Sequence, residues 1–418
     1  MLKEALEIQS QIEKDYARLH YCAETGFDLT KTRAYVKKRL LEMGYQPMDC
    51  GKAGIVAVAG NAGMGKNFLL RADMDALHIK EEADVPFKSV NGNMHACGHD
   101  AHTAMLLGAA KIIKYHEQEL NGSVKFMFQP AEEILEGAKD MIDHGVLEVS
   151  KEITDTQNTQ APKGHPGPGI CHKAKVDGAM MVHVMTGVPL KTGTVVVSAP
   201  GVSAPAADFF RIEINGKGCH GSTPHLGVDA LTAAAHILIA LQEIHARELS
   251  VSDRAALTIG ALEGADVPNA IPDKVILKGS MRAFDEEVRN LMKKRLAEIS
   301  ESVARAFRAE AVVTYTSGAP TLINDKELSE STVIWLKETL GDELVIRSQD
   351  MPGKSSGGSE DFAYVSHEVP SVMVALAAGD SREGYEYPLH HPKMRLDSKA
   401  FAYGAATLAE VAMRYVRV

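Results

Sequence analysis

Tryptophan and long apolar runs are the scarcest features of this sequence. The 418 residues include a single Trp, and aromatic side chains make up 6% of the chain. No uncharged apolar run reaches the ~18 residues that a membrane-spanning helix needs. The N-terminal stretch MLKEALEIQSQIEKDYARLH is charged throughout, which argues against the apolar segment of a secretory signal peptide. We therefore expect neither a membrane partner nor export.

Basic clusters are missing as well. Lys and Arg total 45 against 55 for Asp and Glu, a net charge of −10, and no basic run is long enough to suggest a nucleic-acid partner. The remaining composition, 45% hydrophobic and 24% charged, is that of a globular protein. A chain of this length is sufficient for two domains with sizeable cores.

Cysteine is sparse and odd in number. The five residues, Cys22, Cys50, Cys97, Cys171 and Cys219, are scattered along the chain. In the absence of an export signal they indicate reduced thiols in the cytoplasm rather than a disulfide framework. Only Cys97 has neighbours that suggest chemistry.

The first 200 residues alternate between strand and helix patterns. Short apolar segments bounded by glycine or proline predict strands, and a 3.6-residue apolar period after residue 100 predicts a helix. This alternation favours an α/β fold with a largely parallel central sheet flanked by helices. Residues 150–175 interrupt it with a polar, Pro- and Gly-rich stretch that predicts an exposed loop. The expected strands are 54–60, 67–76, 122–133 and 178–187.

A second pattern begins near residue 204. The order of elements there is β-α-β-β-α-β, which is the split βαβ unit of a small ferredoxin-like α+β domain. After residue 320 the alternating pattern returns, with a buried strand at 370–379. The sequence thus predicts an α/β domain, residues 1–203 and 320–418, interrupted by an inserted domain at 204–319.

The segment ACGHDAHT carries ligand-type side chains just ahead of the predicted helix. Cys97 and His99 are two residues apart in a non-helical segment, so both side chains can reach one centre. Thiolate and imidazole suit Zn, Ni, Co or Mn-type ions rather than Ca or Mg. Histidines that cap a helix are the alternative.

Two adjacent glutamates follow the strand that Pro130 closes. In a regular strand Glu132 and Glu133 would point to opposite faces. Past a proline the chain can turn, so one carboxylate could bind a metal while the other holds a water. A solvated strand end is the plainer interpretation.

Two further histidines complete the set. His183 is flanked by apolar residues, where a core histidine is the usual interpretation, and His390 lies with His391 in a Pro-rich loop, where surface placement is usual. Taken together, the candidates are sufficient for a co-catalytic two-metal site with a free carboxylate beside it. They are Cys97, His99, Glu133, His183 and His390.

Eight motifs occur in an order that resembles a known family. They are RADMDAL, HACGHDAHTAMLLGAA, FQPAEE, GKGCHGSTPH, PNAIPD, GSMRAFD, GSEDFAY and LHHP. This set closely resembles the amidohydrolase branch of the aminoacylase and glutamate-carboxypeptidase metallopeptidases, which includes hippurate hydrolase, N-acyl-amino-acid amidohydrolases and auxin-conjugate hydrolases. The resemblance spans nearly the whole chain and both predicted domains.

The resemblance implies two divalent metal ions per subunit, Zn, Mn, Ni or Co. Cys97 would bridge the two ions, a place that an aspartate takes in related enzymes. His99 and His183 would complete the site of one ion, and Glu133 and His390 the site of the other. The implied activity is hydrolysis of the amide bond of N-acyl amino acids, with a small-molecule substrate.

The resemblance also assigns residues around the metals. Glu132 would be the general base, and Asp75 a carboxylate that orients a metal ligand. The inserted domain would be a lid through which two subunits pair, and each would send His220 to its partner's active site as an oxyanion donor. The expected donors to the substrate carboxylate are Asn269, Arg282, Gly357, Gly358 and Ser359.

Departures from the family pattern concern the substrate rather than the chemistry. The 150–175 loop is longer than usual, residues 134–136 stand where members often have glycines, and residues 193–205 lack an arginine often found near there. These positions lie near the expected site entrance or the lid junction. A metallo-carboxypeptidase or dipeptidase acting on small peptides therefore remains an alternative.

Three readings from other classes compete. GNAGMGKN has the spacing of a phosphate-binding loop, but Asn67 replaces the required Ser or Thr and a strand follows. A thiol hydrolase using Cys97 with His99 or His102 would not need the glutamates. A non-catalytic metal-binding protein would usually have a closed four-ligand site without the spare carboxylate of Glu132.

Overall fold

The chain forms two compact units. The computed structural model describes residues 1–150, 173–264, 266–351 and 358–417, so most of the predicted loop 150–175 lies outside the described residues. No helix in the described part of the chain is long and apolar enough to cross a membrane. Unit 1 comprises Met1–Gly201, Ile323–Gly353 and Val365–Val418, and unit 2 comprises Val202–Leu322 with the described residues of Lys354–Tyr364.

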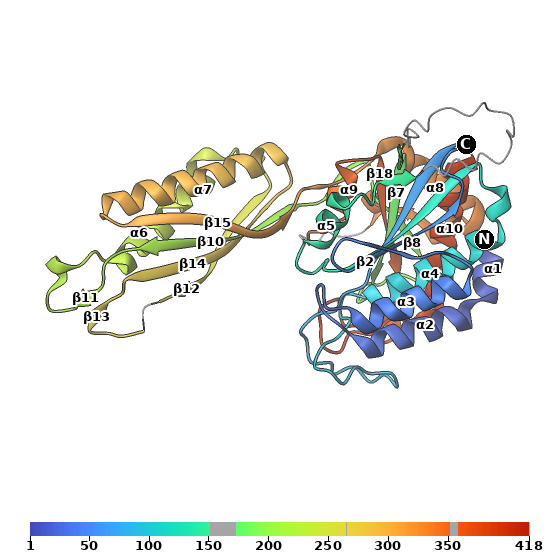
Figure 1. The fold of residues 1–418 in the computed structure, drawn as a ribbon, viewed down its shortest axis with the longest axis horizontal. Helices are drawn as coiled ribbons and strands as arrows, with labels where there is room; N and C mark the ends of the chain where they lie inside the picture. The colour runs from blue at the N-terminus through green and yellow to red at the C-terminus, as the bar shows by residue number, and fades with distance from the viewer. Residues whose placement is uncertain (151–172, 265, 352–357, 418) are drawn as a thin grey trace, which may run out of the picture. The chain divides into compact units, whose positions relative to one another are not determined.

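An eight-stranded mixed sheet forms the centre of unit 1 (Figure 1). The four middle strands, in the order β4-β3-β7-β18, are parallel to one another, which confirms the predicted α/β sheet. Towards the edges, β1-β2, β2-β4 and β18-β8 pair antiparallel. The strands are β1 (Met48–Cys50), β2 (Gly54–Gly60), β3 (Lys66–Asp73), β4 (Gly122–Gln129), β7 (Gly178–Met185), β8 (Val195–Val197), β17 (Val345–Arg347) and β18 (Ser371–Ala377).

Helices cover this sheet. Helix α4 packs against α2, α10 and β3, and its apolar side chains are part of the core of unit 1. The first 45 residues form three helices, because Ala23, with a left-handed φ of 34°, ends α2. Lys66 begins a strand, so the helix that a phosphate-binding loop needs does not follow it. The helices are α1 (Leu2–Glu7), α2 (Gln9–Cys22), α3 (Thr30–Glu42), α4 (His99–Tyr115), α5 (Gly137–Asp143), α8 (Lys326–Leu340), α9 (Ala363–Ser366) and α10 (Phe401–Arg417).

Unit 2 has the predicted ferredoxin-like arrangement. Its antiparallel sheet has the order β12-β14-β10-β15, and two helices that contact each other pack on it (Figure 1). The side chains of Asp229 and Asp285 cap these helices by accepting backbone N–H groups of the first turn. The elements are β10 (Ala206–Asn215), α6 (Ala230–Ala240), β12 (Ala255–Glu263), β14 (Lys274–Ala283), α7 (Glu286–Ala306) and β15 (Glu310–Ala319).

Three two-stranded pairs complete the described elements. The chain passes from unit 1 to unit 2 within β9 (Gly201–Ala204) and returns within β16 (Leu322–Asn324), and these two strands pair with each other. The entry and the exit of the inserted unit are therefore adjacent. The other pairs are β5 (Glu148–Ser150) with β6 (Lys173–Lys175), and β11 (Cys219–His220) with β13 (Ala270–Ile271).

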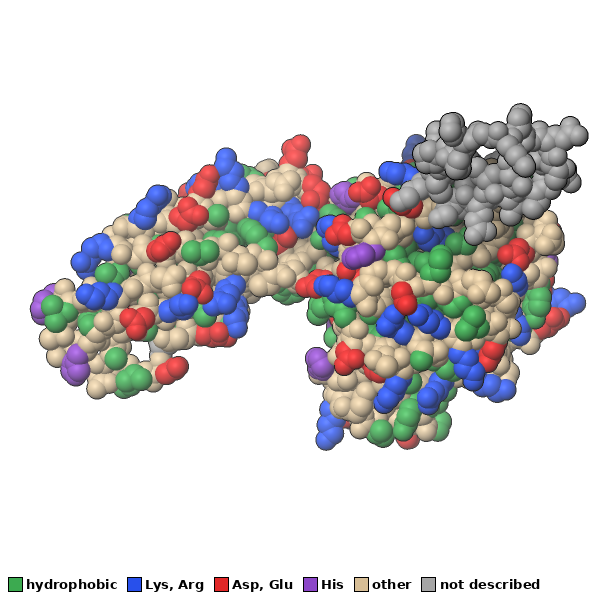
Figure 2. Space-filling view, viewed as in Figure 1, with side chains coloured by type: hydrophobic (Ala, Val, Ile, Leu, Met, Phe, Trp, Pro, Cys, Tyr) green, Lys and Arg blue, Asp and Glu red, His purple; other side chains and the backbone are tan. Residues whose placement is uncertain are grey.

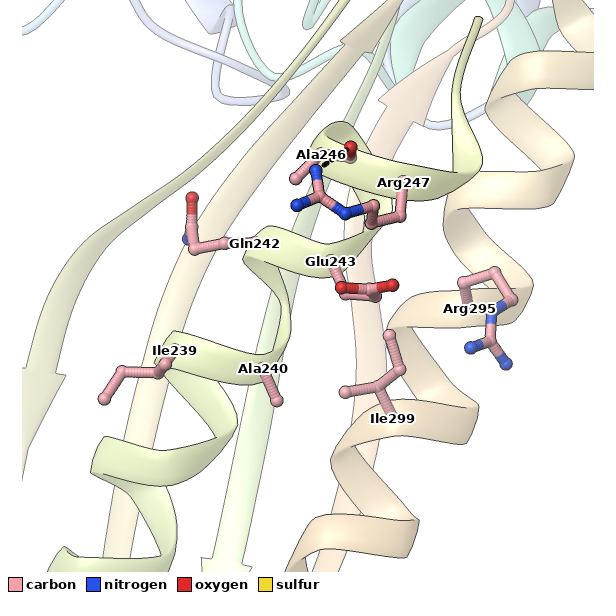
Figure 3. A pocket seen from close by; sticks show the side chains of 8 residues that line it. All are labelled: Ile239, Ala240, Gln242, Glu243, Ala246, Arg247, Arg295 and Ile299. Carbon is pink, nitrogen blue, oxygen red and sulfur yellow. Dashed lines mark hydrogen bonds between the residues drawn. The ribbon is translucent and has the colours of Figure 1, made fainter.

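The described surface carries mixed charges and a pocket that none of the predicted site residues lines. Acidic and basic side chains are interspersed on the visible face of each unit (Figure 2). A surface pocket of unit 2 lies between the end of α6, the π-helical turn Ile244–Glu248 and α7 (Figure 3). Ile239 and Ile299 line it together with charged side chains, of which Arg295 is already paired with Glu248 at 2.6 Å. None of the predicted site residues contributes to this pocket.

Candidate metal centre

The parallel strands bring three candidate segments to one edge of the sheet. Asp73, the last residue of β3, pairs with Gln129, the last residue of β4. Residues 130–133 and Asp75 follow directly, and His183 lies near the end of β7. In sheets of this class, the carboxyl ends of parallel strands are where ligands bind.

A glycine turn delivers Cys97 and His99 to this edge. Gly98 has a left-handed φ of 86° just ahead of α4, and a Cβ there would lie 2.4 Å from Val184 Cγ2. Only glycine can adopt this backbone conformation where there is no room for a Cβ. Ligand atoms of Cys97, His99 and His183 all lie within 4.8 Å of one another, and Cys97 Sγ is 3.6 Å from His183 Nε2.

A second group of ligand atoms shares the same thiol. Cys97, Glu133 and His390 also present ligand atoms within 4.8 Å of one another. His390 comes from the loop after β18, and its N–H donates to Ala96 O at 2.8 Å. Its left-handed φ of 66° is rare for a residue with a side chain. The two groups together form a five-residue cluster with Cys97 common to both.

Hydrogen bonds at Nδ1 fix two histidine rings of this cluster, so that their Nε2 atoms can serve as metal ligands. His99 Nδ1 donates to Asp75 O at 2.8 Å, and His183 Nδ1 donates to Val184 O at 2.7 Å, so each Nε2 is left without a proton in the neutral ring. Among the described residues, His99 Nε2 and Glu133 Oε1 are buried and have no hydrogen-bond partner. Unpaired buried polar atoms are rare in proteins and call for an explanation. A cation bound between these two atoms would explain why neither has a hydrogen-bond partner.

The electrostatics of the cluster also favour a cation. Burial raises the pKa of the Cys97 thiol well above its usual range, and Glu133 and Glu132 add to the shift. Burial, aided by Asp75, raises the pKa of Glu133 to about 7 although His99 opposes it. Without a cation the thiol is therefore neutral, which argues against Cys97 as an independent nucleophile. Thiolate, imidazole and carboxylate ligands fit a pair of Zn-, Mn-, Co- or Ni-type ions.

A strained turn sets the direction of the two glutamates. Ala131 and Leu135 have left-handed φ values of 56° and 57°. Asp75 holds the turn between them, because its Oδ1 accepts the N–H of Glu132 at 2.9 Å and its Oδ2 that of Glu133 at 3.2 Å. The carboxylate of Asp75 thus positions both glutamates, and its main-chain carbonyl orients His99. The predicted ligand-orienting role of Asp75 is divided between these two groups.

Glu132 lies next to the cluster and is also buried. Its Oε2 is 3.7 Å from His99 Nε2, and Glu133 Oε1 lies 3.8 Å from the same nitrogen. Only Glu133 also joins Cys97 and His390 in a ligand group. Glu132 and Glu133 also share a ligand group with His99, so the division between a metal ligand and a free carboxylate stays a prediction.

Sequence reasoning did not assign the layer beneath the cluster. His102 Nδ1 donates to Asp73 Oδ1 at 2.6 Å, and His102 Nε2 accepts the N–H of Val184 at 2.8 Å. Burial lowers the pKa of His102 to about 4 although Asp73 opposes it, so this ring is neutral. Arg71, fully buried, binds the other oxygen of Asp73 at 2.6 Å. The signals in the sequence were the third histidine of HACGHDAHT and the Arg and first Asp of RADMDAL.

Unit 2 separates its predicted site residues into two places. His220 and Asn269 are neighbours, since Gly221 N donates to Asn269 O at 2.8 Å, and both are exposed. His220 Nδ1 accepts the N–H of Ser222 at 3.1 Å, so the neutral ring carries its proton on Nε2. Arg282 is at the far end of β14, eight residues from Lys274, which is roughly 26 Å along the strand. One copy of unit 2 therefore does not bring Arg282 to His220.

The remaining predicted donors lie in the segment before α9. Gly358 is exposed, and the buried Oγ of Ser359 has no hydrogen-bond partner among the described residues. Gly357 lies outside the described residues. Arg282 is half-buried, has a pKa lowered by burial, and forms no ion pair within the described part of the chain.

Residues 69–414 match peptidase family M20/M25/M40. The chain belongs to this family. It is thus a hydrolase of amide bonds. It is 34% identical to N-acetyl-L-cysteine deacetylase of Bacillus subtilis (95% of this chain, 86% of the relative) and 31% identical to hippurate hydrolase of Campylobacter jejuni (100% of both). Its fold resembles that of Bacillus subtilis YXEP, a dinuclear metal binding peptidase, with a TM-score of 0.74, 26% identity and coverage of 98% and 99%.

Replacing Asp75 with Asn tests how the glutamates of this family member are held. Asp75→Asn keeps the shape but turns one acceptor into a donor that faces a backbone N–H of Glu132 or Glu133. We expect kcat/KM to fall roughly 10–100-fold, as is usual when a partner that orients metal ligands is lost, with an unchanged far-UV circular dichroism spectrum. Asp84→Asn, at an exposed position before α4, is the control. Equal activity of the two variants would contradict the role of Asp75.

Proposed function

We propose that this protein is a metal-dependent amidohydrolase that cleaves the amide bond of N-acyl, or N-aminoacyl, amino acids. The observation that carries the proposal is the pair of ligand groups that share Cys97, with the carboxylate of Glu132 beside them. Relatives named as a deacetylase of an N-acetyl amino acid and as hippurate hydrolase support this substrate class. Cleavage of small peptides by the same chemistry is the runner-up.

The proposed ligands divide between two metal positions. Cys97, His99 and His183 would hold one ion, and Cys97, Glu133 and His390 would hold the other. Divalent ions in such a pair polarise a carbonyl and bring the pKa of water from 15.7 towards about 7. We propose Zn, Mn, Co or Ni, because the donor set contains a thiolate and imidazoles.

Glu132 then performs the proton transfers. Its carboxylate, within 3.7 Å of His99 Nε2, accepts a proton from the attacking water and donates it to the nitrogen of the leaving amine. Its burial keeps bulk water from competing for this proton. General acid–base catalysis of this kind contributes typically 10²–10⁴-fold.

The other end of the substrate is a carboxylate. Arg282 is a candidate for binding it, because its half-buried guanidinium lacks an ion-pair partner in the described structure. Ser359 Oγ, the backbone at 357–358 and Asn269 are further donors in the proposal. A guanidinium forms paired, charge-assisted hydrogen bonds with a carboxylate.

We infer that a second subunit completes the site. Arg282 lies roughly 26 Å of strand from Lys274, the residue at which β14 begins, shortly after Asn269 in the chain. We infer that one lid cannot supply Arg282, Asn269 and His220 to one substrate. The outer side of β12, at the edge of the lid sheet, pairs with no described strand. Pairing of two lids through this domain would form the homodimer and bring His220 of one chain to the substrate of the other. We also propose a cytoplasmic location, which suits the scattered, odd number of cysteines.

The test of the proposed function is a substrate screen combined with matched glutamate variants. The protein is loaded with Mn, Zn, Co or Ni and offered N-acyl amino acids and dipeptides. Glu132→Gln should lower kcat on the best substrate about 10²–10⁴-fold and retain two metal ions by elemental analysis, whereas Glu133→Gln should lose metal.

Each contrary result points to a different alternative. Faster cleavage of dipeptides than of N-acyl amino acids would favour the peptidase reading. Hydrolysis by Glu132→Gln at the wild-type rate would remove the proposed base, and loss of metal only in that variant would reverse the roles of the two glutamates.

Cys97 should be needed for metal binding, and bound metal should protect its thiol from alkylation. Cys97→Ser exchanges a soft bridging thiolate for a hydroxyl, so metal content and activity should fall together. A chelator should inactivate the wild type, whereas iodoacetamide should leave the metal-loaded enzyme active. Cys50→Ser is the control, because Cys50 is a buried thiol outside the cluster. Full metal content and normal kcat in Cys97→Ser would refute its role as a ligand.

The partner role of His220 can be tested by subunit mixing. His220→Ala should be folded, metal-loaded and nearly inactive, since loss of one oxyanion donor can cost about 3 kcal/mol. Mixing it with Glu132→Gln subunits should restore activity, because one site of the mixed dimer then has both intact residues. Mass-labelled subunits show whether exchange has occurred. Exchange without any return of activity would exclude the role across the dimer.

A further inference from the structure

His20, near the end of α2, is a buried histidine with two acidic partners. Its Nδ1 lies 2.6 Å from Asp100 Oδ2 and its Nε2 lies 3.0 Å from Glu81 Oε1. A neutral imidazole has one N–H and can donate to only one of these carboxylates, whereas the imidazolium donates to both. Burial lowers the pKa of His20, but the hydrogen bonds to Asp100 and Glu81 outweigh burial and raise it to about 9.

The two carboxylates belong to segments that carry proposed metal ligands. Asp100 is the second residue of α4 and directly follows His99; its other oxygen accepts the N–H of Ala101 at 2.8 Å. Glu81 lies in the long connection between β3 and α4 that ends at Cys97, and its other oxygen accepts the N–H of Ser89 at 2.9 Å. His20 therefore links α2 to both sides of the Cys97–His99 turn.

The residues just after His20 make further contacts of the same kind. We refer to residues 20–26 as the support segment. The side-chain amide of Asn91 donates to the carbonyls of residues 22 and 23 at 2.9 and 3.0 Å. Ala76 N donates to Glu24 O at 2.8 Å, and Ala131 N donates to Gly26 O at 3.1 Å. The support segment thus touches the neighbours of Asp75 and of Glu132 as well as the turn that holds Cys97.

Aromatic rings enclose the His20 cation. Tyr16 and Phe87 meet its ring edge to face, with centroids 5.7 and 5.2 Å away, and the His95 ring lies 6.3 Å away. Their packing leaves His20, Glu81 and Asp100 almost without solvent exposure. Electrostatic attraction is stronger where water is excluded, and two opposed carboxylates fix the ring in one orientation.

We propose that His20 is a positioning residue of the metal centre: held between Asp100 and Glu81, it sets the placement of the Cys97–His99 turn relative to the other ligands. It touches neither substrate nor metal. The proposal rests on the metal site put forward above, but it is tested by metal binding and not by turnover alone.

The chain offers a closely matched control at the other end of α4. His116 also faces two carboxylates, Glu119 at 2.7 Å and Glu4 at 2.6 Å, but it is partly exposed and follows the last residue of the helix. The same substitution at both positions removes an imidazole held between two carboxylates. Only the one at His20 lies beside proposed ligands.

The experiment compares His20→Gln with His116→Gln in the full-length protein. Both are stripped of metal, checked for folding by circular dichroism, and titrated with Co²⁺ in the presence of a competing chromophoric chelator. We expect His20→Gln to bind Co²⁺ roughly 10–100-fold more weakly, with altered thiolate-to-cobalt and d–d absorption bands, and His116→Gln to match the wild type. At saturating metal, His20→Gln should lower kcat more than it changes KM.

Each other outcome overturns the proposal or separates it from the proposed function. Wild-type affinity and an unchanged cobalt spectrum in folded His20→Gln would refute it. If that variant does not fold, Glu81→Gln, which leaves the Asp100 contact in place, should show a smaller change in the same direction; failure of both to fold would assign His20 to folding alone. Wild-type protein that binds no Co²⁺ would refute the metal site itself, whereas metal binding without amide hydrolysis would refute only the proposed reaction.

Discussion

The parallel alignment of β4, β3, β7 and β18 is the constraint on which the candidate site depends. Because these strands run in the same direction, the segments that leave them meet at one edge of the sheet. Asp75 lies 57 residues before Glu132 and 58 before Glu133 in the chain. The register of Asp73 with Gln129 nevertheless brings the Asp75 carboxylate within hydrogen-bonding distance of both. A shift of this register would separate Glu132 and Glu133 from Asp75.

The sequence predicted the fold class and the candidate residues better than the long-range pairing that brings them together. Strand patterns, the inserted βαβ unit and the family resemblance identified the fold class and a set of candidate ligands, because periodicity and motif spacing are local properties. The antiparallel edges of the main sheet and the separation of Arg282 from His220 depend on long-range pairing, which no local pattern encodes. His20 escaped notice for the same reason: its partners, Glu81 and Asp100, are 61 and 80 residues away.

Backbone strain is concentrated where the proposed chemistry takes place. Ala131, Leu135 and His390 all have left-handed φ values, a conformation that costs about 1–2 kcal/mol for a residue with a side chain. Leu135 stands at a position where the resembling family often has glycine, yet its side chain is buried, and burial of a leucine contributes roughly 1.5–3 kcal/mol. The N–H groups of Ala131 and Glu132 donate to Gly26 O and to Asp75 Oδ1 and hold the first of these turns in place.

The position of β18 between β7 and β8 has a consequence for synthesis on the ribosome. Residues 178–185 and 195–197 leave the ribosome early, but the strand that joins them, Ser371–Ala377, is made almost two hundred residues later. By then the whole inserted unit has emerged, and its entry and exit strands, β9 and β16, can already pair. The ferredoxin-like unit can therefore fold first, while the half-built sheet exposes unpaired strand edges, which are prone to aggregation.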